Sequence, residues 1–188
     1  MTHIIYFSKT SRRGPSSRYR IYQFLPILKA EGIHIKVNPF FDDFYFTIIE
    51  VKNSPLRFFL KIIYSLYSFS KRFFQLLKTR NSCVIVVEYQ LFPYMPAFVE
   101  FFFLRISKKR YLEFDDAVYL SFLHKKKFDR ILPFYTGIIA GNENLASFAL
   151  KKNKNVVVHP TLIDAEKVIP KSSYAITGRV VIGWIGLA

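Results

Sequence analysis

The sequence predicts an α/β fold, in which a parallel sheet lies between helices on both of its faces as a three-layer structure. The main observation is that short apolar runs of strand length alternate with segments of helical length along the 188 residues. This alternation is typical of parallel strands that are joined by helical crossovers. Several runs, such as CVIVVEY at 83–89, are apolar without alternation, as expected of strands that are covered on both faces.

Seven segments are predicted to be strands: 3–7, 33–37, 83–89, 110–114, 137–141, 156–159 and 180–186. The first helix is expected over 16–32, after the first strand. Ser16 or Ser17 can cap its N-terminus and Gly32 can end it. Pro26 is expected to kink or break this helix, because proline lacks the backbone donor that a helix interior requires.

A second helix is predicted over 56–80, with a polar stripe along an otherwise Phe-, Leu-, Ile- and Tyr-rich sequence. The stripe consists of Arg57, Lys61, Ser65, Ser68 and Arg72. One interpretation is a packed helix whose polar stripe faces solvent. The other is a helix that rests on a membrane, where aromatic side chains insert and basic ones meet anionic headgroups. The apolar segment 91–106 is predicted to be a buried or interfacial helix.

The chain is strongly basic, with 28 Lys and Arg against 13 Asp and Glu and a net charge of +15. Such a surface attracts nucleic acid, acidic lipid headgroups or phosphorylated small molecules. Nucleic acid is not the expected partner, since the basic residues are spread along the chain and no nucleic-acid-binding motif accompanies them. The N-terminal residues have no basic lead and a short apolar run, so no signal peptide is predicted and a cytoplasmic location is expected.

The loop after the first strand, SKTSRRGPSSRYR at 8–20, is a candidate anion-binding site. Backbone N–H groups at a helix N-terminus favour an anion, and arginine adds paired donors for phosphate. Gly14, Ser17 and Arg18 are the candidate ligands, with Arg18 the strongest of them. A solvated basic loop is the alternative. A single glycine in this loop excludes the glycine-rich phosphate-binding motifs.

Acidic side chains follow two other predicted strands. Glu88 follows CVIVV, where it can accept hydrogen bonds from ligand hydroxyls or form an ion pair at the sheet edge. Asp115 and Asp116 follow the next strand, with Glu113 just before them, so three of the 13 acids lie within four residues. Ligands of parallel sheets bind at the carboxyl ends of the strands, which makes these acids the central candidates.

The Asp115–Asp116 pair can bind a metal, or it can bind a hydroxyl and act as a general base. No further ligand set supports a metal, so none is expected. One aspartate is expected to face the cleft while the other caps a following helix, AVYLSFLHK; capping by both is the alternative. Asn142, after the fifth predicted strand, can cap a helix or contribute to ligand binding.

These pieces, in this order, resemble the N-terminal domain of family 4 glycosyltransferases of the GT-B fold. The resemblance rests on SSRYRIYQFLPILKAEGI, VVEYQLFPYMPAFVE, LEFDDAVYL, IIAGNENLASFALKKNKNVVVHPTLID and VVIGWIG. It implies a Rossmann-like acceptor-binding domain at 1–167, a linker at 168–179 and, at 180–188, the first strand of a donor-binding domain. The chain is therefore expected to be truncated and inactive alone.

The resemblance also implies roles for the candidate residues. Asp115, with Asp116 behind it, would orient or deprotonate a hydroxyl of a glycan or lipid-linked acceptor, and Glu88 would hold another hydroxyl. Arg18 would bind a phosphate. The family needs no metal or cofactor; its donor is a nucleotide-sugar, bound by the second domain. Many members act at the inner membrane face, which would suit the basic helix at 56–80. The family's glycine-rich first loop is reduced here to Gly14-Pro15. A non-catalytic membrane-surface binding protein with the same fold is the alternative.

Overall fold

The computed structural model describes residues 4–79, 84–121 and 125–164, together with 169, 170, 172, 173, 175, 178–180 and 183. Its centre is a six-stranded, all-parallel sheet in the order β2-β1-β3-β4-β5-β6. The strands are β1 (Ile4–Phe7), β2 (Ile35–Val37), β3 (Val84–Glu88), β4 (Lys109–Phe114), β5 (Gly137–Ala140) and β6 (Val156–Val158). The predicted parallel α/β fold is confirmed. Apart from 180 and 183, the residues of the strand expected at 180–186 lie outside the described residues, and so do residues 168, 171, 174, 176 and 177 of the linker expected at 168–179.

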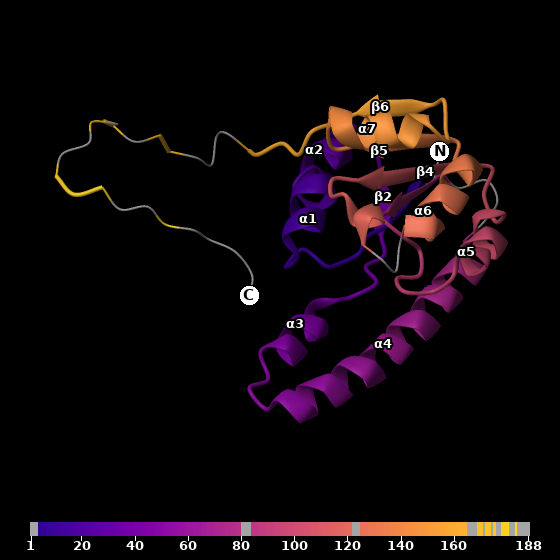
Figure 1. Cartoon of the computed structure of the whole chain (residues 1–188), viewed down its shortest axis with the longest axis horizontal. Coiled ribbons are helices and arrows are strands. Elements are labelled where there is room, and N and C mark those ends of the chain that lie inside the picture. Colours follow the sequence, from indigo (N-terminus) through magenta and orange to yellow (C-terminus); the bar gives the residue numbers. More distant parts are fainter. Residues whose placement is uncertain are drawn as a thin grey trace.

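Helical segments connect the strands, and Figure 1 shows α1 and α2 on one side of the sheet and α5 and α6 on the other. The α-helices are α1 (Pro15–Ser17), α2 (Leu25–Ala30), α3 (Asp43–Ile49), α4 (Ser54–Leu77), α5 (Ala97–Leu104), α6 (Lys125–Ile131) and α7 (Glu143–Leu150). A π-helical turn, η1 (Arg18–Tyr22), follows α1, and two 3₁₀ turns, η2 (Val118–Leu120) and η3 (Leu132–Phe134), flank α6. The sheet therefore has helical layers on both faces, as the sequence predicts.

The first helical segment differs from its prediction at the N-terminus. It begins at Pro15 with Gly14 as the capping residue, and no side chain caps it, so the expected cap by Ser16 or Ser17 is wrong. Both hydroxyls instead bond to side chains at the sheet edge. The expected interruption is confirmed, since η1 ends at Tyr22 and α2 begins at Leu25, next to Pro26.

The two faces of the sheet carry different kinds of side chain. One face presents apolar residues such as Val87, Leu112 and Phe114, which belong to a cluster with Leu76 of α4 and Phe128 of α6. The other face presents Tyr6, Glu88 and Glu113, all buried, to the segment formed by α1 and η1. The polar side chains are thus concentrated on the face under the first helical segment.

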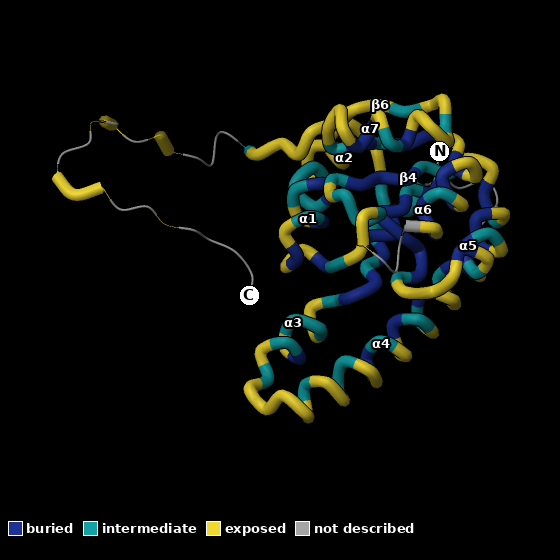
Figure 2. Tube along the Cα trace, viewed as in Figure 1, coloured by how far each residue is buried: buried dark blue, intermediate teal, exposed yellow. Residues whose placement is uncertain are grey.

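Helix α4 forms close to where the sequence predicts it, but its polar side faces the protein interior and its apolar side faces solvent. Ser68 and Arg72 of the polar stripe are fully buried, so the expectation of a solvated stripe is wrong. The Arg72 guanidinium lies 4.7 Å from the ring centre of Phe7 and 5.6 Å from that of Phe40, and it donates a 3.0 Å hydrogen bond to the Ser8 carbonyl. The apolar side of α4 is exposed (Figure 2).

Candidate functional site

The candidate site lies where the carboxyl ends of β1, β3 and β4 meet the first helical segment. Glu88 ends β3, and it pairs in the strand register with Glu113 of β4. Asp115 and Asp116 follow β4 directly. The fold therefore gathers four carboxyl groups at one edge of the sheet, in a chain whose net charge is +15.

Glu88 is held by donors from the loop after β1. Its Oε2 accepts a 2.7 Å hydrogen bond from the Ser17 hydroxyl and a 3.0 Å bond from the Lys9 backbone N–H. The side chain is only 1% exposed, and this burial raises the pKa of Glu88 to about 7, against the lowering effect of the two donors. Its Oε1 is buried and accepts no hydrogen bond from the part of the chain that is described.

Glu113 forms a buried ion pair with Arg20 of η1. The Arg20 Nε lies 2.5 Å from Glu113 Oε1, and the Tyr6 hydroxyl donates a 2.5 Å bond to Oε2. Burial raises the pKa of Glu113, while the Arg20 charge opposes that rise. Arg20 also donates a 2.7 Å bond to the carbonyl of His159, directly after β6. Arg20 thus connects β4 to the segment that leaves the sheet.

Asp115 lies at the solvent border of the cluster and is half-buried. It accepts hydrogen bonds from the hydroxyls of Ser16 at 3.0 Å, Thr161 at 3.5 Å and Tyr89. These hydroxyls come from α1, from the segment after β6 and from the end of β3. Asp115 is therefore fixed by three separate segments of the chain.

Asp116 is exposed, and its Oδ2 lies 3.3 Å from the Tyr89 hydroxyl. Neither Asp115 nor Asp116 caps a helix: the residue before η2 is Ala117, and no side chain caps that turn. The expectation that one of them is an N-cap is wrong, because a short 3₁₀ turn follows the pair in place of a helix. Lys125 begins the next helix, α6.

Tyr89 adopts a backbone φ of 61°, in the left-handed region that non-glycine residues seldom occupy. The Tyr89 hydroxyl donates a hydrogen bond to Asp115 across the end of the sheet. Burial and the neighbouring Asp115 charge raise the pKa of Tyr89, so the phenol keeps its proton at neutral pH. Backbone strain of this kind is concentrated at functional sites.

Three of the predicted site residues have other positions or roles. Arg18 is exposed and lies over the ring of Tyr19, 5.1 Å from its centre. Asn142 caps α7 by accepting a bond from the Leu145 N–H, the structural alternative raised for it. Gly14 is buried beneath Thr10, where a Cβ would lie 1.9 Å from the Thr10 Oγ1. Glu88, Ser17 and Asp115 do come together, with Asp116 beside them.

Sequence pattern alone does not predict Arg20 or Tyr89 as site residues, and it predicts only a capping role for Ser16. Arg20 lies two residues after Arg18 on the same helical segment. Which of the two arginines is buried depends on which side of that segment packs against the sheet. Tyr89 is the last residue of the strand predicted at 83–89, and this position at the carboxyl end of a strand could have identified it. Thr161 lies 46 residues from its partner Asp115, and no local pattern indicates that contact.

The arrangement is suited to hydroxyl-bearing ligands. Carboxylates accept hydrogen bonds from hydroxyls, and a hollow of about 50 Å³ lies beside Glu88, Tyr89 and Lys9. A hollow of that size admits one polar group of a ligand, so most of a larger ligand would lie outside it. Within residues 4–79, 84–121 and 125–164, no three His, Cys, Asp or Glu side chains are grouped so that they could hold a metal ion.

Comparisons of this chain with protein-family models, curated proteins and solved structures give no match. The functional interpretation therefore depends on the site itself, and the resemblance to family 4 glycosyltransferases stays a prediction.

Proposed function

We propose that this chain is the acceptor-binding half of a glycosyltransferase, which transfers a sugar from a nucleotide-sugar to a glycan or lipid-linked acceptor. The observation that carries the proposal is the set of three hydroxyls, from Ser16, Tyr89 and Thr161, that bond to Asp115 at the solvent border. A site that already binds hydroxyls through a carboxylate has the chemistry that a polyhydroxylated ligand needs.

In this proposal Asp115 orients the acceptor hydroxyl and takes its proton. The hydroxyl oxygen forms a bond to the anomeric carbon of the donor as the bond from that carbon to the nucleotide phosphate breaks. Asp116 lies beside Asp115 on its solvent side, and Glu88 holds a second hydroxyl. Arg18, exposed on the adjacent segment, contacts a phosphate of the acceptor or donor. The nucleotide-sugar would bind chiefly to a second domain, in line with the resemblance.

Saturation-transfer NMR with a panel of sugars tests the binding part of this proposal. The probes are glucose, galactose, mannose, N-acetylglucosamine and their 1-phosphates, each mixed with the purified chain. We expect transfer to at least one probe, and loss of that transfer in Asp115→Asn. Asp129→Asn is the matched control, since it makes the same chemical change on α6.

Absence of transfer to every probe, or equal transfer with wild type and Asp115→Asn, would remove the proposed acceptor site. The unfolding midpoint of each variant is measured in parallel, so that loss of binding is not confused with loss of folding.

A further inference from the structure

Helix α4 exposes a continuous apolar face. Ten of its large apolar side chains are each at least 41% exposed: Leu56, Phe58, Phe59, Ile62, Ile63, Leu66, Tyr67, Phe73, Phe74 and Leu77. We call them the α4 apolar face. The helix has 24 residues, so it is about 36 Å long. Contiguous apolar patches of this extent are rare on monomers and mark interaction sites.

The face is directed away from the protein because the polar stripe of α4 is directed inward. Tyr64, Ser68, Arg72 and Leu76 are the buried residues of the helix, and they lie opposite the α4 apolar face at 3.6 residues per turn. Figure 1 shows that α3 and the first half of α4 project from the body that holds the sheet. The exposed apolar side chains are thus on the most accessible part of the fold.

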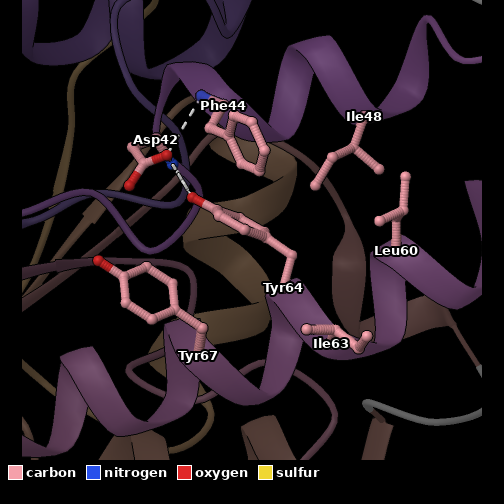
Figure 3. Close-up of a pocket in the computed structure, with 7 residues that line it drawn as sticks. All are labelled: Asp42, Phe44, Ile48, Leu60, Ile63, Tyr64 and Tyr67. Atoms are coloured by element: carbon pink, nitrogen blue, oxygen red, sulfur yellow. Dashed lines mark hydrogen bonds between the residues drawn. The ribbon is translucent and has the colours of Figure 1, made fainter.

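A cavity of about 490 Å³ opens between α3 and α4, at the edge of this face. Figure 3 shows Phe44 and Ile48 of α3 opposite Leu60 and Ile63 of α4. Ile63 and Tyr67 line the cavity and also belong to the α4 apolar face, so the two surfaces are continuous. The volume is in the range of pockets that bind small ligands, and the walls are apolar.

At the polar end of the cavity, the polar side chains of the protein bond to one another. Asp42 accepts a hydrogen bond from the Tyr64 hydroxyl and forms an ion pair with Lys71, with 2.8 Å between the Lys71 Nζ and the Asp42 Oδ2. The occupant therefore meets hydrocarbon and aromatic walls, with one neutralised polar end. Part of a lipid acyl chain has the matching chemistry.

The charges around the face select among possible occupants. Between residues 51 and 87 the chain has seven Lys and Arg and no Asp or Glu. Lys52 and Lys78, at the two ends of α4, are exposed. A symmetric dimer through this face would bring basic segments together with no acid of the same segment to pair them. An anionic bilayer offers hydrocarbon to the face and negative headgroups to the lysines.

We propose that the α4 apolar face docks this protein on an anionic phospholipid bilayer, with α4 in the plane of the interface and the α3–α4 cavity taking part of an acyl chain. In the part of the chain that is described, no helix is long and apolar enough to cross a membrane, so α4 lies on the bilayer in this arrangement. The proposal does not depend on the sugar chemistry proposed above.

Vesicle co-sedimentation tests the proposal. The full chain is mixed with vesicles of phosphatidylcholine alone and of phosphatidylcholine with a quarter phosphatidylglycerol. We expect binding to the anionic vesicles, weakened by salt, and a loss of about tenfold or more in Leu66→Glu, because a carboxylate would enter the hydrocarbon boundary. Ile27→Glu on α2 is the matched control: Ile27 is 62% exposed and Leu66 is 63% exposed.

A fluorescent variant measures insertion directly. Phe59→Trp is introduced together with Trp184→Phe, so that the single tryptophan lies on the α4 apolar face. We expect its emission to shift to shorter wavelength with anionic vesicles, and to be quenched by lipids brominated on their acyl chains. A matched Ile27→Trp variant is expected to show neither effect.

Three results would overturn the proposal. The first is that wild type fails to bind the anionic vesicles. The second is that Leu66→Glu and Ile27→Glu reduce binding equally. The third is a wild-type dimer, seen by sedimentation, that Leu66→Glu converts to a monomer without vesicle binding; the occupant of the face would then be a second copy of this chain.

Discussion

Glu88 and Glu113 occupy paired positions on neighbouring strands, and both side chains are buried. Two like charges directly across a strand pair repel each other. Each of the two glutamates is stabilised by a different set of partners. Glu113 is paired with Arg20, whereas Glu88 receives hydrogen bonds from Ser17 and the Lys9 N–H. Because no ion pair balances its burial within the described residues, Glu88 keeps its proton up to about pH 7.

The variant Glu88→Gln tests whether Glu88 is protonated, because protonation makes the stability of the wild type depend on pH. The pKa of Glu88 is raised by burial from 4.5 to about 7 in the folded state, so folding binds a proton between these values. The contribution of Glu88 to stability is therefore fully present below about pH 4.5 and is lost as pH rises through 7. We therefore expect the free energy of unfolding of Glu88→Gln, taken relative to wild type, to be about 3 kcal/mol higher at pH 8 than at pH 4.5.

Urea unfolding at the two pH values measures this difference. Glu143→Gln on α7, where the side chain is exposed, serves as the control and is expected to follow wild type. If Glu88→Gln also follows wild type at both pH values, the pKa of Glu88 in the folded protein is not raised, and the predicted protonation is wrong.

Arg20→Ala tests the buried ion pair. Removing the guanidinium leaves Glu113 buried without its cation, and breaking a buried pair in this way costs about 3–5 kcal/mol. Arg18→Ala, two residues earlier, is expected to change stability by about 0.5 kcal/mol or less, because Arg18 is exposed. Denaturant midpoints of the two variants make the comparison. Similar losses in both would show that Arg20 is not the residue that holds β4 to η1.

Arg72→Met tests whether the inward-facing arginine of α4 stabilises the fold. Arg72 is fully buried, and burial lowers its pKa to about 9. Its Nε and Nη1 have no hydrogen-bond partner among the described residues. Replacing such a charge by an apolar side chain of similar length is expected to raise the free energy of unfolding by about 1 kcal/mol or more.

Arg57→Met is the control for Arg72→Met, since Arg57 belongs to the same stripe but is only half-buried. Calorimetric unfolding of both variants gives the answer. A clear loss of stability in Arg72→Met would mean that its contacts with Phe7, Phe40 and the Ser8 carbonyl outweigh the cost of burying the charge.

Gly14→Ala tests the close approach of the first helix to the loop before it. A Cβ at Gly14 would lie 1.9 Å from the Thr10 Oγ1 and 2.5 Å from the Thr10 Cβ. We expect a loss of about 1–3 kcal/mol, as for overpacking elsewhere. In a Thr10→Gly background, which removes both of those atoms, the same change is expected to cost much less. Additive losses in the double variant would exclude this collision as the cause.

Much of the fold follows from local pattern. The apolar runs predict all six strands of the described sheet, and Pro26 and Gly32 predict where the first helical segment breaks and ends. Glu88 and Asp115 could be singled out because each follows a strand, and parallel strands present their carboxyl ends at one edge. The capping predictions for Ser16, Ser17 and the aspartates failed because these side chains bond across the sheet edge instead.

Local pattern was enough to predict the succession of strands and helices along the chain, the position of the acids at strand ends and the existence of a two-sided α4, since each depends on periodicity or on neighbours along the chain. Three features became visible only in the folded chain: Arg20 rather than Arg18 is buried, Tyr89 and Thr161 bond to Asp115, and the polar side of α4 faces inward. The physical reason is that helical periodicity specifies which residues share a face. Which face is buried depends on the neighbours that packing supplies, and here Phe7, Phe40 and the Ser8 carbonyl surround Arg72.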